Sequence, residues 1–355
     1  IGNSYVGGLA GMVNSEDGVS ACYNSGMVRG SELAVGGLVG QMVGPINNCY
    51  NTGTVSGNDK VGGLVGDHQK ANQDNLILNN CFNVGSVSGE TDIGRIAGCL
   101  EAAIVADNCY YQSETATQGI GNDDETPDQT QSKTAAAFAS GEVAWLLQNG
   151  QSNPTIPTWG QRLTVGGDAW PTLKDNPRVY RLTLMQGDSS LYEQSFRNPG
   201  HTITLDKVAG ISWKDALGAS FTEISDDSDH TLFPWLTNPP IPVPTATAVY
   251  GTRIRDIGIS GASIPAGSWS WKLTPEMENL VLPVNHNSTC SARFIANDGP
   301  QGIIDVEITP VISARSLTAA EVLISQPTNV NYCGTAIEPE ITVVDSGAVI
   351  TPDDY

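Results

Sequence analysis

The sequence predicts a mainly β protein: a short parallel β-solenoid (β-helix) with a helical cap, followed by small β-sandwich modules. Three observations predict this class: a motif that occurs four times in the first third of the chain, one helical pattern after it, and short alternating runs in the remainder. The repeat determines the architecture, because stacked copies of one unit share a continuous core. Its copies begin with VGGLAG at Val6, VGGLVG at Val35, VGGLVG at Val61 and IGRIAG at Ile93.

Each copy is completed by a cysteine and an aromatic residue. The cysteines at positions 22, 49, 81 and 109 are 27, 32 and 28 residues apart. A unit of this length holds either a helix pair or about three short strands with turns. The Gly-Gly pairs, the Asn-Thr-Gly and Val-Ser-Gly turns and the β-branched residues oppose a helix. We therefore expect coils of about three strands, stacked so that neighbouring coils complete one core.

The glycine pair of the motif is expected to shape each coil. Strict strand alternation would point Val35 and Leu38 to opposite faces, and a bend at Gly36-Gly37 would turn both inward. The fourth copy has Arg95 in place of the second glycine. We expect a distorted or edge rung at that position.

The repeat cysteines occupy the same place in successive coils, which predicts a buried ladder of small apolar side chains. No CxxC motif or Cys/His pair with the spacing of a zinc site occurs, so no metal is expected. Three further cysteines are isolated, and a disulfide between Cys290 and Cys333 remains an open alternative.

Where VGGLVG is followed by INNCYNTGTVSG, the copies resemble GLUG repeats, a motif of bacterial surface proteins. The resemblance covers about residues 1–111. It implies an extracellular location at the bacterial cell surface and a role in adhesion. It implies no particular chemistry.

The charge of the chain limits its partners. It carries 38 acidic against 17 basic residues, a formal net charge of −21, which repels nucleic acid and anionic membrane surfaces. No apolar run of about 18 residues exists, so no membrane insertion is expected, and no signal peptide is found. The chain opens inside what resembles the tail of an earlier coil. We expect a piece of a longer protein whose export signal and anchor lie outside it.

Residues 1–115 are assigned to the solenoid, and residues 116–177 to an acidic loop and a capping segment. Such a loop suggests calcium binding, but the DxDxDG spacing of a dedicated calcium loop is missing, so a solvated loop is the alternative. Its acidic residues are Asp123, Asp124, Glu125 and Asp128.

A cap for the solenoid is predicted after this loop. Residues 134–149 have helical periodicity and end before Gly150, and a helix there would cover the unpaired solenoid edge. With the WGQ and DAWP motifs that follow, the segment resembles the one that commonly closes GLUG arrays. Trp145, Trp159 and Trp170 are interpreted either as a core plug or as a sugar-stacking platform.

Residues 178–237 predict a small β module because their apolar residues alternate. The run Asp226, Asp227, Asp229 and His230 is interpreted as an exposed turn, since adjacent residues on a turn cannot all converge on one atom. The proline-rich residues 238–245 predict a stiff linker.

Residues 246–325 predict a β-sandwich in which Trp269 and Trp271 share an inward face. The segment resembles the immunoglobulin-like modules of bacterial surface proteins, with Tyr250-Gly251 ahead of a tryptophan strand. Residues 326–355 resemble the start of a further module, truncated, with Tyr-Cys-Gly where such modules often have Tyr-Thr-Gly or Tyr-Asp-Gly.

No catalytic motif is found. The four histidines form no HExxH, and there is no GxSxG elbow, P-loop or dinucleotide fingerprint. The carboxylates Asp59, Asp67, Asp74 and Asp92 do not recur at one coil position, as a β-helix polysaccharide-processing enzyme would need. We expect neither catalytic residues nor a cofactor.

The aromatic residues after the repeat cysteines recur in register. They either form an exposed ladder on one solenoid face or cover the sheet structurally, and they are the candidate ligand-binding residues: Tyr23, Tyr50, Phe82 and Tyr110. The sequence therefore predicts a non-catalytic surface adhesin whose partner is a host surface glycan or an extracellular-matrix protein. The alternatives are a carbohydrate-binding module and, with less support, a polysaccharide-processing enzyme.

Overall fold

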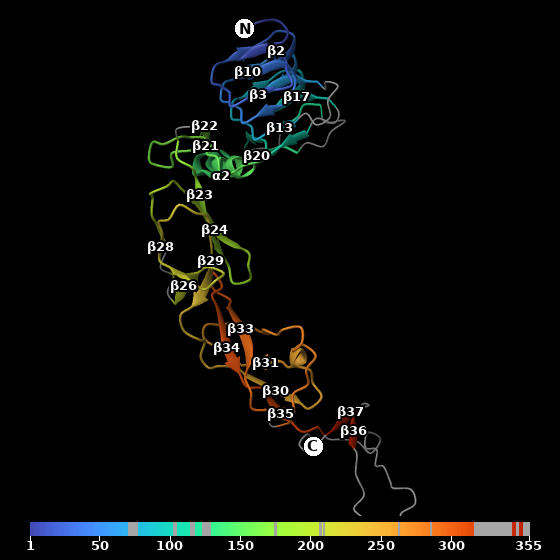
Figure 1. The fold of residues 1–355 in the computed structure, drawn as a ribbon, viewed down its shortest axis with the longest axis vertical. Coiled ribbons are helices and arrows are strands. Elements are labelled where there is room, and N and C mark those ends of the chain that lie inside the picture. Colours follow the sequence, from blue (N-terminus) through green and yellow to red (C-terminus); the bar gives the residue numbers. More distant parts are fainter. Residues whose placement is uncertain are drawn as a thin grey trace, which may run out of the picture. The chain divides into compact units, whose positions relative to one another are not determined.

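The computed structural model describes residues 1–315 and the strands at 343–345 and 348–350, except for residues 70–76, 102–104, 114–117, 123–128, 174–175, 206–207, 209, 262 and 285. The chain forms two compact units. Figure 1 colours the chain by sequence position. Unit 1 contains Ile1–Leu182, Gln194–Thr204 and Glu223–His230. Unit 2 contains Thr183–Glu193, Leu205–Thr222 and Thr231–Tyr355.

Unit 1 begins with a parallel β-solenoid of about three turns, which confirms the predicted class. Its coils pair strand by strand in register, as in Val6↔Val35, Val35↔Val61 and Val61↔Ile93. Three of its sheets have four strands. The first contains β1 (Val6–Gly7), β6 (Leu33–Gly36), β11 (Asp59–Gly62) and β16 (Thr91–Gly94), and the second contains β2 (Ala10–Asn14), β7 (Val39–Val43), β12 (Val65–His68) and β17 (Ala97–Leu100).

Three further sheets complete the solenoid. The third contains β3 (Val19–Ser20), β8 (Ile46–Asn47), β13 (Ile77–Asn79) and β18 (Val105–Asp107). The fourth contains β4 (Tyr23–Asn24), β9 (Tyr50–Asn51), β14 (Phe82–Asn83), β19 (Tyr110–Gln112) and β20 (Gln131–Lys133), and the fifth contains β5 (Val28–Arg29), β10 (Val55–Ser56) and β15 (Val87–Ser88). A coil thus has up to five very short strands, not the expected three, because a corner or glycine turn interrupts the chain every few residues.

Two corners of each coil have a left-handed backbone. The residue before the first Val or Ile of every repeat has a φ between 47° and 60°, and the residue before every repeat cysteine has a φ between 48° and 52°. Asparagine tolerates this conformation better than other non-glycine residues, and it occupies three of these eight positions. The eight are Tyr5, Ala34, Lys60 and Asp92, and Ala21, Asn48, Asn80 and Asn108.

The repeat cysteines point inward, as predicted. Cys49, Cys81 and Cys109 are buried in the solenoid core, Cys22 packs against it, and all four are free thiols. Each thiol donates to the backbone carbonyl two residues earlier, with sulfur–oxygen distances of 3.1–3.2 Å. A small apolar side chain that can also donate weakly to a buried carbonyl suits this position. Burial raises the pKa of the Cys81 thiol well above its ordinary value.

The fourth rung is an edge rung but is not distorted. Its strand β16 ends its sheet, and it keeps the register Asp59↔Thr91, Val61↔Ile93 and Gly62↔Gly94. A Cβ on Gly63 would lie 2.0 Å from the Arg95 carbonyl oxygen and 2.5 Å from the Asn83 amide. The fourth coil has Tyr111 in the register position of Asn83. The Arg95 side chain therefore meets no asparagine of its own coil, while the Arg95 carbonyl accepts from the Asn83 amide at 2.9 Å.

The cap consists of two helices instead of the single one predicted: α1 (Ala135–Ser140) and α2 (Glu142–Asn149). Gly141 separates them because its φ of 95° is left-handed. The Thr134 hydroxyl accepts from the Ala137 N–H at 3.1 Å and starts α1, and Gly150 ends α2 as predicted. The strands β21 (Trp159–Gly160) and β22 (Thr172–Leu173) follow.

The remaining strands of unit 1 and those of unit 2 are short to medium in length. The border between the units falls within β23 (Tyr180–Met185), β24 (Leu191–Arg197) and β29 (His230–Leu236), so it divides residues 178–237. The other strands of this region are β25 (Ile203–Thr204), β26 (Ile211–Lys214), β27 (Ser220–Phe221) and β28 (Glu223–Ile224).

In unit 2, β26 pairs antiparallel with β29, and β29 pairs parallel with β34 (Ile303–Ile308). Strand β34 then pairs antiparallel with β33 (Cys290–Ala296), and β33 pairs antiparallel with β32 (Gly267–Trp271). A three-stranded sheet has the order β31 (Ile259–Ser260), β30 (Thr245–Val249), β35 (Val311–Ser313). A 3-10 helix spans Ile254–Asp256, and β36 (Val343–Asp345) pairs with β37 (Ala348–Ile350). As predicted, Trp269 and Trp271 share one face and pack against the core of this unit.

Candidate functional site

Tyr23, Tyr50, Phe82 and Tyr110, here called the aromatic column, lie in register on β4, β9, β14 and β19. The rings of Tyr23 and Tyr50 stack with centroids 4.9 Å apart and planes 5° apart, and those of Tyr50 and Phe82 stack identically. Only Tyr23 is exposed, at 55%, whereas Phe82 is fully buried. The column is therefore not an open ladder.

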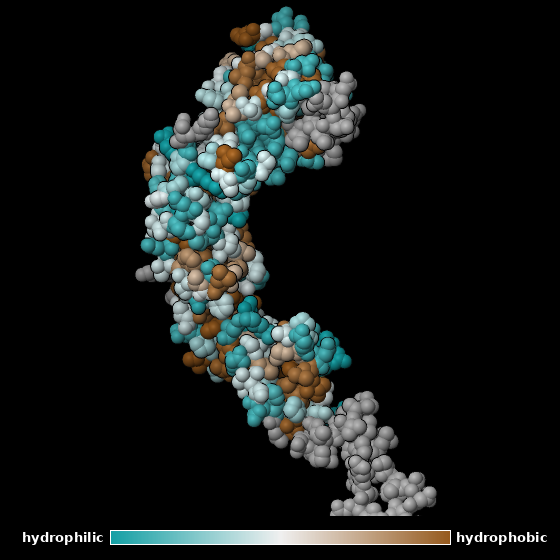
Figure 2. Space-filling model, in the orientation of Figure 1, coloured by the Kyte–Doolittle hydropathy of each residue, from teal (hydrophilic) through white to brown (hydrophobic). Residues whose placement is uncertain are grey.

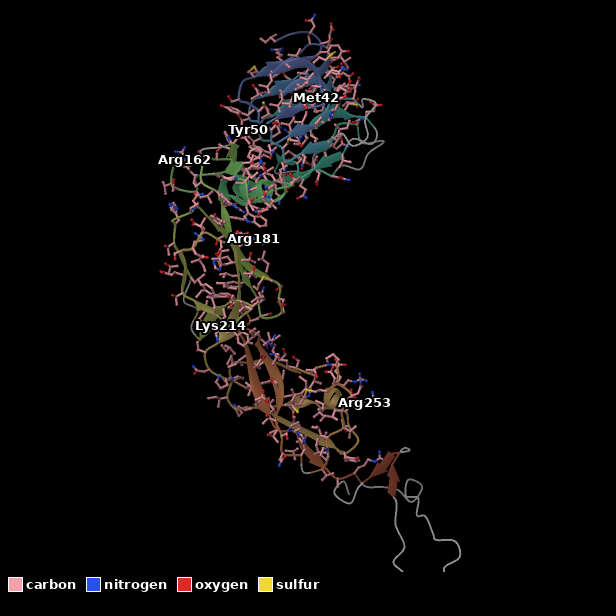
Figure 3. The ribbon with its side chains drawn as sticks, viewed as in Figure 1. Met42, Tyr50, Arg162, Arg181, Lys214 and Arg253 are labelled. Atoms are coloured by element: carbon pink, nitrogen blue, oxygen red, sulfur yellow. The ribbon has the colours of Figure 1, made fainter. Side chains whose placement is uncertain are left out.

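The cap covers the buried part of the aromatic column (Figure 3, Tyr50). Phe138 of α1 lies 5.5 Å from the ring of Phe82, and Trp159 lies 5.6 Å from Phe82 and 5.9 Å from Tyr50. The Trp159 indole also donates to the Asn48 side chain at 3.0 Å. Burial raises the pKa of Tyr50 to about 12. The structural alternative thus holds for Tyr50, Phe82 and Tyr110, and Trp159 is a plug.

Asparagines follow the aromatic residues and form a second column: Asn24, Asn51 and Asn83. The Asn24 amide donates to Asn51 at 2.8 Å, and the Asn51 amide donates to Asn83 at 2.9 Å. Each also closes its own NxG turn, as Asn51 does by donating to the Gly53 carbonyl and accepting from the Gly53 N–H. The column ties successive coils together within a buried environment.

Replacing Asn51 by alanine is expected to lower the free energy of unfolding by about 2–3 kcal/mol, because Asn83 and the Gly53 turn lose their buried partners. Asn24 is only half-buried and lies in the first coil, so Asn24→Ala is expected to cost less than half as much. Urea denaturation of both variants checks this. Equal losses would contradict a role of burial in the column.

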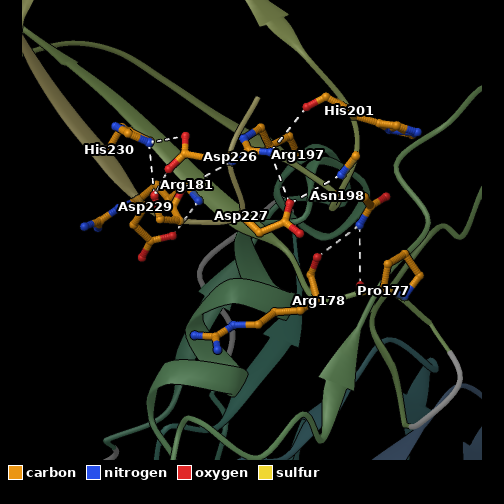
Figure 4. A network of polar contacts seen from close by, with 12 residues as sticks. Pro177, Arg178, Arg181, Arg197, Asn198, His201, Asp226, Asp227, Asp229 and His230 are labelled. Carbon is orange, nitrogen blue, oxygen red and sulfur yellow. Dashed lines mark hydrogen bonds and ion pairs between the residues drawn. The ribbon is translucent and has the colours of Figure 1, made fainter. Parts of the chain in front are cut away.

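The run from Asp226 to His230 does not converge on one point (Figure 4). The Asp226 carboxylate lies 2.7 Å from the His230 ring, whereas Asp227 accepts from the Gly200 N–H. Asp229 accepts from the Trp145 indole at 3.0 Å and from the Arg181 N–H at 2.8 Å. Arg181 also lies 4.0 Å over the Trp145 ring. These contacts join strands to the cap, and Trp145 serves this junction.

His68 stands in a core column of the solenoid, in register with Val13, Met42 and Leu100. Its Nε2 donates to the Gly44 carbonyl at 2.7 Å, and its Nδ1 has no partner within the described residues. Burial lowers the pKa of His68 to about 4. The ring is therefore neutral in the folded solenoid.

Acid is expected to destabilise the chain through His68. Its folded pKa lies below the unfolded value near 6.5, so the unfolded chain binds the proton first. The effect is absent above pH 6.5, grows by about 1.4 kcal/mol per pH unit as the pH falls toward 4, and levels off at about 3 kcal/mol. Denaturation of the chain and of His68→Met between pH 4 and 7 measures it. Identical pH slopes in the two proteins would refute the assignment.

Unit 2 contains a pocket of about 460 Å³ that the sequence did not indicate. We call it the Trp235 pocket. Strand register places its main side chains on one face of the sheet, because Trp235 pairs with Ile303 and Arg293 with Asp305. Lys214 borders the pocket on the same face, because it pairs with Phe233. The residues that line it are Gly187, Ser189, Asp215, Ala216, Leu217, Gly218, Phe233, Trp235, Lys272, Arg293 and Ile303.

Two cations lie close to the Trp235 ring. Lys214, which borders the pocket without being one of its lining residues, lies 5.3 Å over the indole ring, and Arg293 of the lining lies 5.8 Å from it. Arg293 holds Asp305 through two hydrogen bonds of 2.8 and 3.0 Å, and Lys272 donates to the same carboxylate at 2.8 Å. The Arg293 guanidinium keeps the pKa of Asp305 below its ordinary value. The sequence signal for this pocket is limited to the alternation of Phe233 with Trp235. The cations come from strands far apart in the sequence, and only strand pairing brings them together.

Two sequence hypotheses lie outside the described residues: the acidic loop with Asp123, Asp124, Glu125 and Asp128, and the pairing of Cys333 with Cys290. Within the described ranges, no group of three or more His, Cys, Asp or Glu side chains could hold a metal ion. In the same part of the chain, no helix combines the length and the apolar character that crossing a bilayer requires.

No protein-family model matches the chain, and neither a curated protein nor a solved structure is detectably similar to it.

Proposed function

We propose that the chain is a non-catalytic adhesin of a bacterial cell surface, with the solenoid as a contact surface and immunoglobulin-like modules in the C-terminal half as a stalk. The GLUG-like motif supports this proposal. Its recurring residues are those that stack the coils: inward valines and leucines, the repeat cysteines, and asparagines in their turns. A host surface glycan or an extracellular-matrix protein is the proposed partner.

One observation carries the proposal: outward positions vary while the scaffold stays constant. The register position of Leu33 holds Asp59 and Thr91 in the next two coils, and all three side chains are at least partly exposed. A repeat scaffold with a variable outer face is typical of extended binding surfaces. The first coil adds exposed apolar side chains, which Figure 2 shows as brown surface at that end. The apolar side chains include Leu9, Met12 and Met27, and the first coil also exposes the rings of Tyr5 and Tyr23.

Binding of the whole chain to an array of host glycans and extracellular-matrix proteins tests the proposal, with release of reducing sugar followed in the same wells. We expect binding without release. Tyr23→Ala, at the exposed end of the aromatic column, reports whether the first coil takes part. Sugar release would establish an enzyme instead, and an array without binding would make the chain a structural spacer.

A further inference from the structure

We infer that the Trp235 pocket binds a sugar carrying a single carboxylate, such as a glucuronic acid unit at the end of an otherwise neutral glycan. The inference rests on the proposed function, because it names the ligand class for a glycan-binding surface protein. Its site lies in unit 2, apart from the aromatic column that the sequence singled out.

The first argument is the supply of hydrogen-bond donors. Lys214, labelled in Figure 3, has no carboxylate partner among the described residues. Its ammonium group lies 5.3 Å from the centroid of the Trp235 ring. Lys272 uses one of its three N–H donors on Asp305, and its side chain is 56% exposed. Both ammonium groups thus keep donors for an incoming carboxylate, and charged hydrogen bonds of this kind are the strong ones.

The second argument is that Arg293 and Asp305 form a support for Lys272. Nε and Nη2 of Arg293 donate to Oδ1 and Oδ2 of Asp305, and Nζ of Lys272 donates to the same Oδ2. Holding a long side chain in place in advance lowers the entropy that binding would otherwise cost. Asp215 is occupied differently, since it accepts from the Leu217 and Ala219 N–H groups of its own turn.

The third argument concerns size and charge. The pocket volume of about 460 Å³ lies in the range of small-ligand sites, and half-buried Trp235 and Phe233 offer apolar surface for the C–H groups of a sugar ring. The net charge of −21 repels a polyanion. A ligand with a single carboxylate is attracted mainly by the cations next to it. The charges of the chain that lie more than about 8 Å away are screened at physiological salt.

Titration of the ¹⁵N-labelled full chain with methyl β-glucuronoside, and separately with methyl β-glucoside, tests the inference by NMR. The probe is the indole N–H signal of Trp235, which is assigned from its absence in Trp235→Phe. We expect it to shift with the glucuronoside only. Lys214→Met and Lys272→Met should each weaken binding about fivefold. Arg253→Met removes a positive charge outside the pocket and should change binding less than twofold.

Equal shifts with both glycosides, no shift with either, or full binding by the lysine variants would each overturn the inference. The glycan array separates this result from the adhesin proposal. If neutral glycans or matrix proteins bind on the array while the glucuronoside does not, the adhesin proposal stands and the pocket assignment falls. If the glucuronoside binds but the array is silent, the pocket assignment stands and the adhesin proposal falls.

Discussion

Phe82→Ala is expected to lower the free energy of unfolding of unit 1 by about 3–5 kcal/mol, the range for removing a fully buried ring. Phe82 has no exposed surface and contacts Tyr50, Phe138 and Trp159. Its loss removes the side chain on which the aromatic column and the cap meet. Urea denaturation, followed by the emission of the seven tryptophans, Trp159 among them, measures the change.

Tyr23→Ala is the matched control, since it removes a ring from the same column at its exposed end. It should cost less than about 1 kcal/mol. If the two variants lose similar stability, the cap does not depend on the buried column. A red shift of tryptophan emission before the main transition in Phe82→Ala alone would indicate that the cap separates first.

Gly37→Ala is expected to cost at least about 3 kcal/mol, because overpacking against backbone cannot be relieved by a rotamer change. The added Cβ would lie 2.0 Å from the Gly63 carbonyl oxygen and 2.6 Å from Cγ of Asn51. Either the coils separate there or the asparagine column breaks. Denaturation and far-ultraviolet circular dichroism of the variant check this.

Gly258→Ala provides the comparison, because a Cβ at that glycine meets no atom within 4 Å. We expect its stability to stay within about 0.5 kcal/mol of the unaltered chain. A small effect at Gly37 would mean that the coil spacing adjusts. The fourth coil already tolerates a side chain at this position of the repeat. Arg95 replaces the glycine there, and Tyr111 replaces the asparagine that the side chain would otherwise meet.

The predicted site illustrates why a periodic pattern was insufficient. The recurrence of Tyr23, Tyr50, Phe82 and Tyr110 correctly predicted rings in register. It could not reveal what covers them, because Phe138 and Trp159 come from segments tens of residues away. Tyr50, Phe82 and Tyr110 are buried because the cap packs on them. Trp145 of the cap has another role, because its indole N–H donates to the Asp229 carboxylate.

The sequence by itself determined the parallel solenoid, the inward cysteines, the position of the cap and the inward tryptophans of unit 2. These features follow from local periodicity and from residue types that recur in each copy. Only the tertiary structure decided the number of strands per coil. Tyr5, Ala34, Lys60 and Asp92 share no side-chain property, yet all adopt a left-handed corner because the register with neighbouring coils requires it. The Trp235 pocket has the same origin, since strand pairing brings Lys214, Lys272 and Arg293 to one face from three separate strands or strand ends.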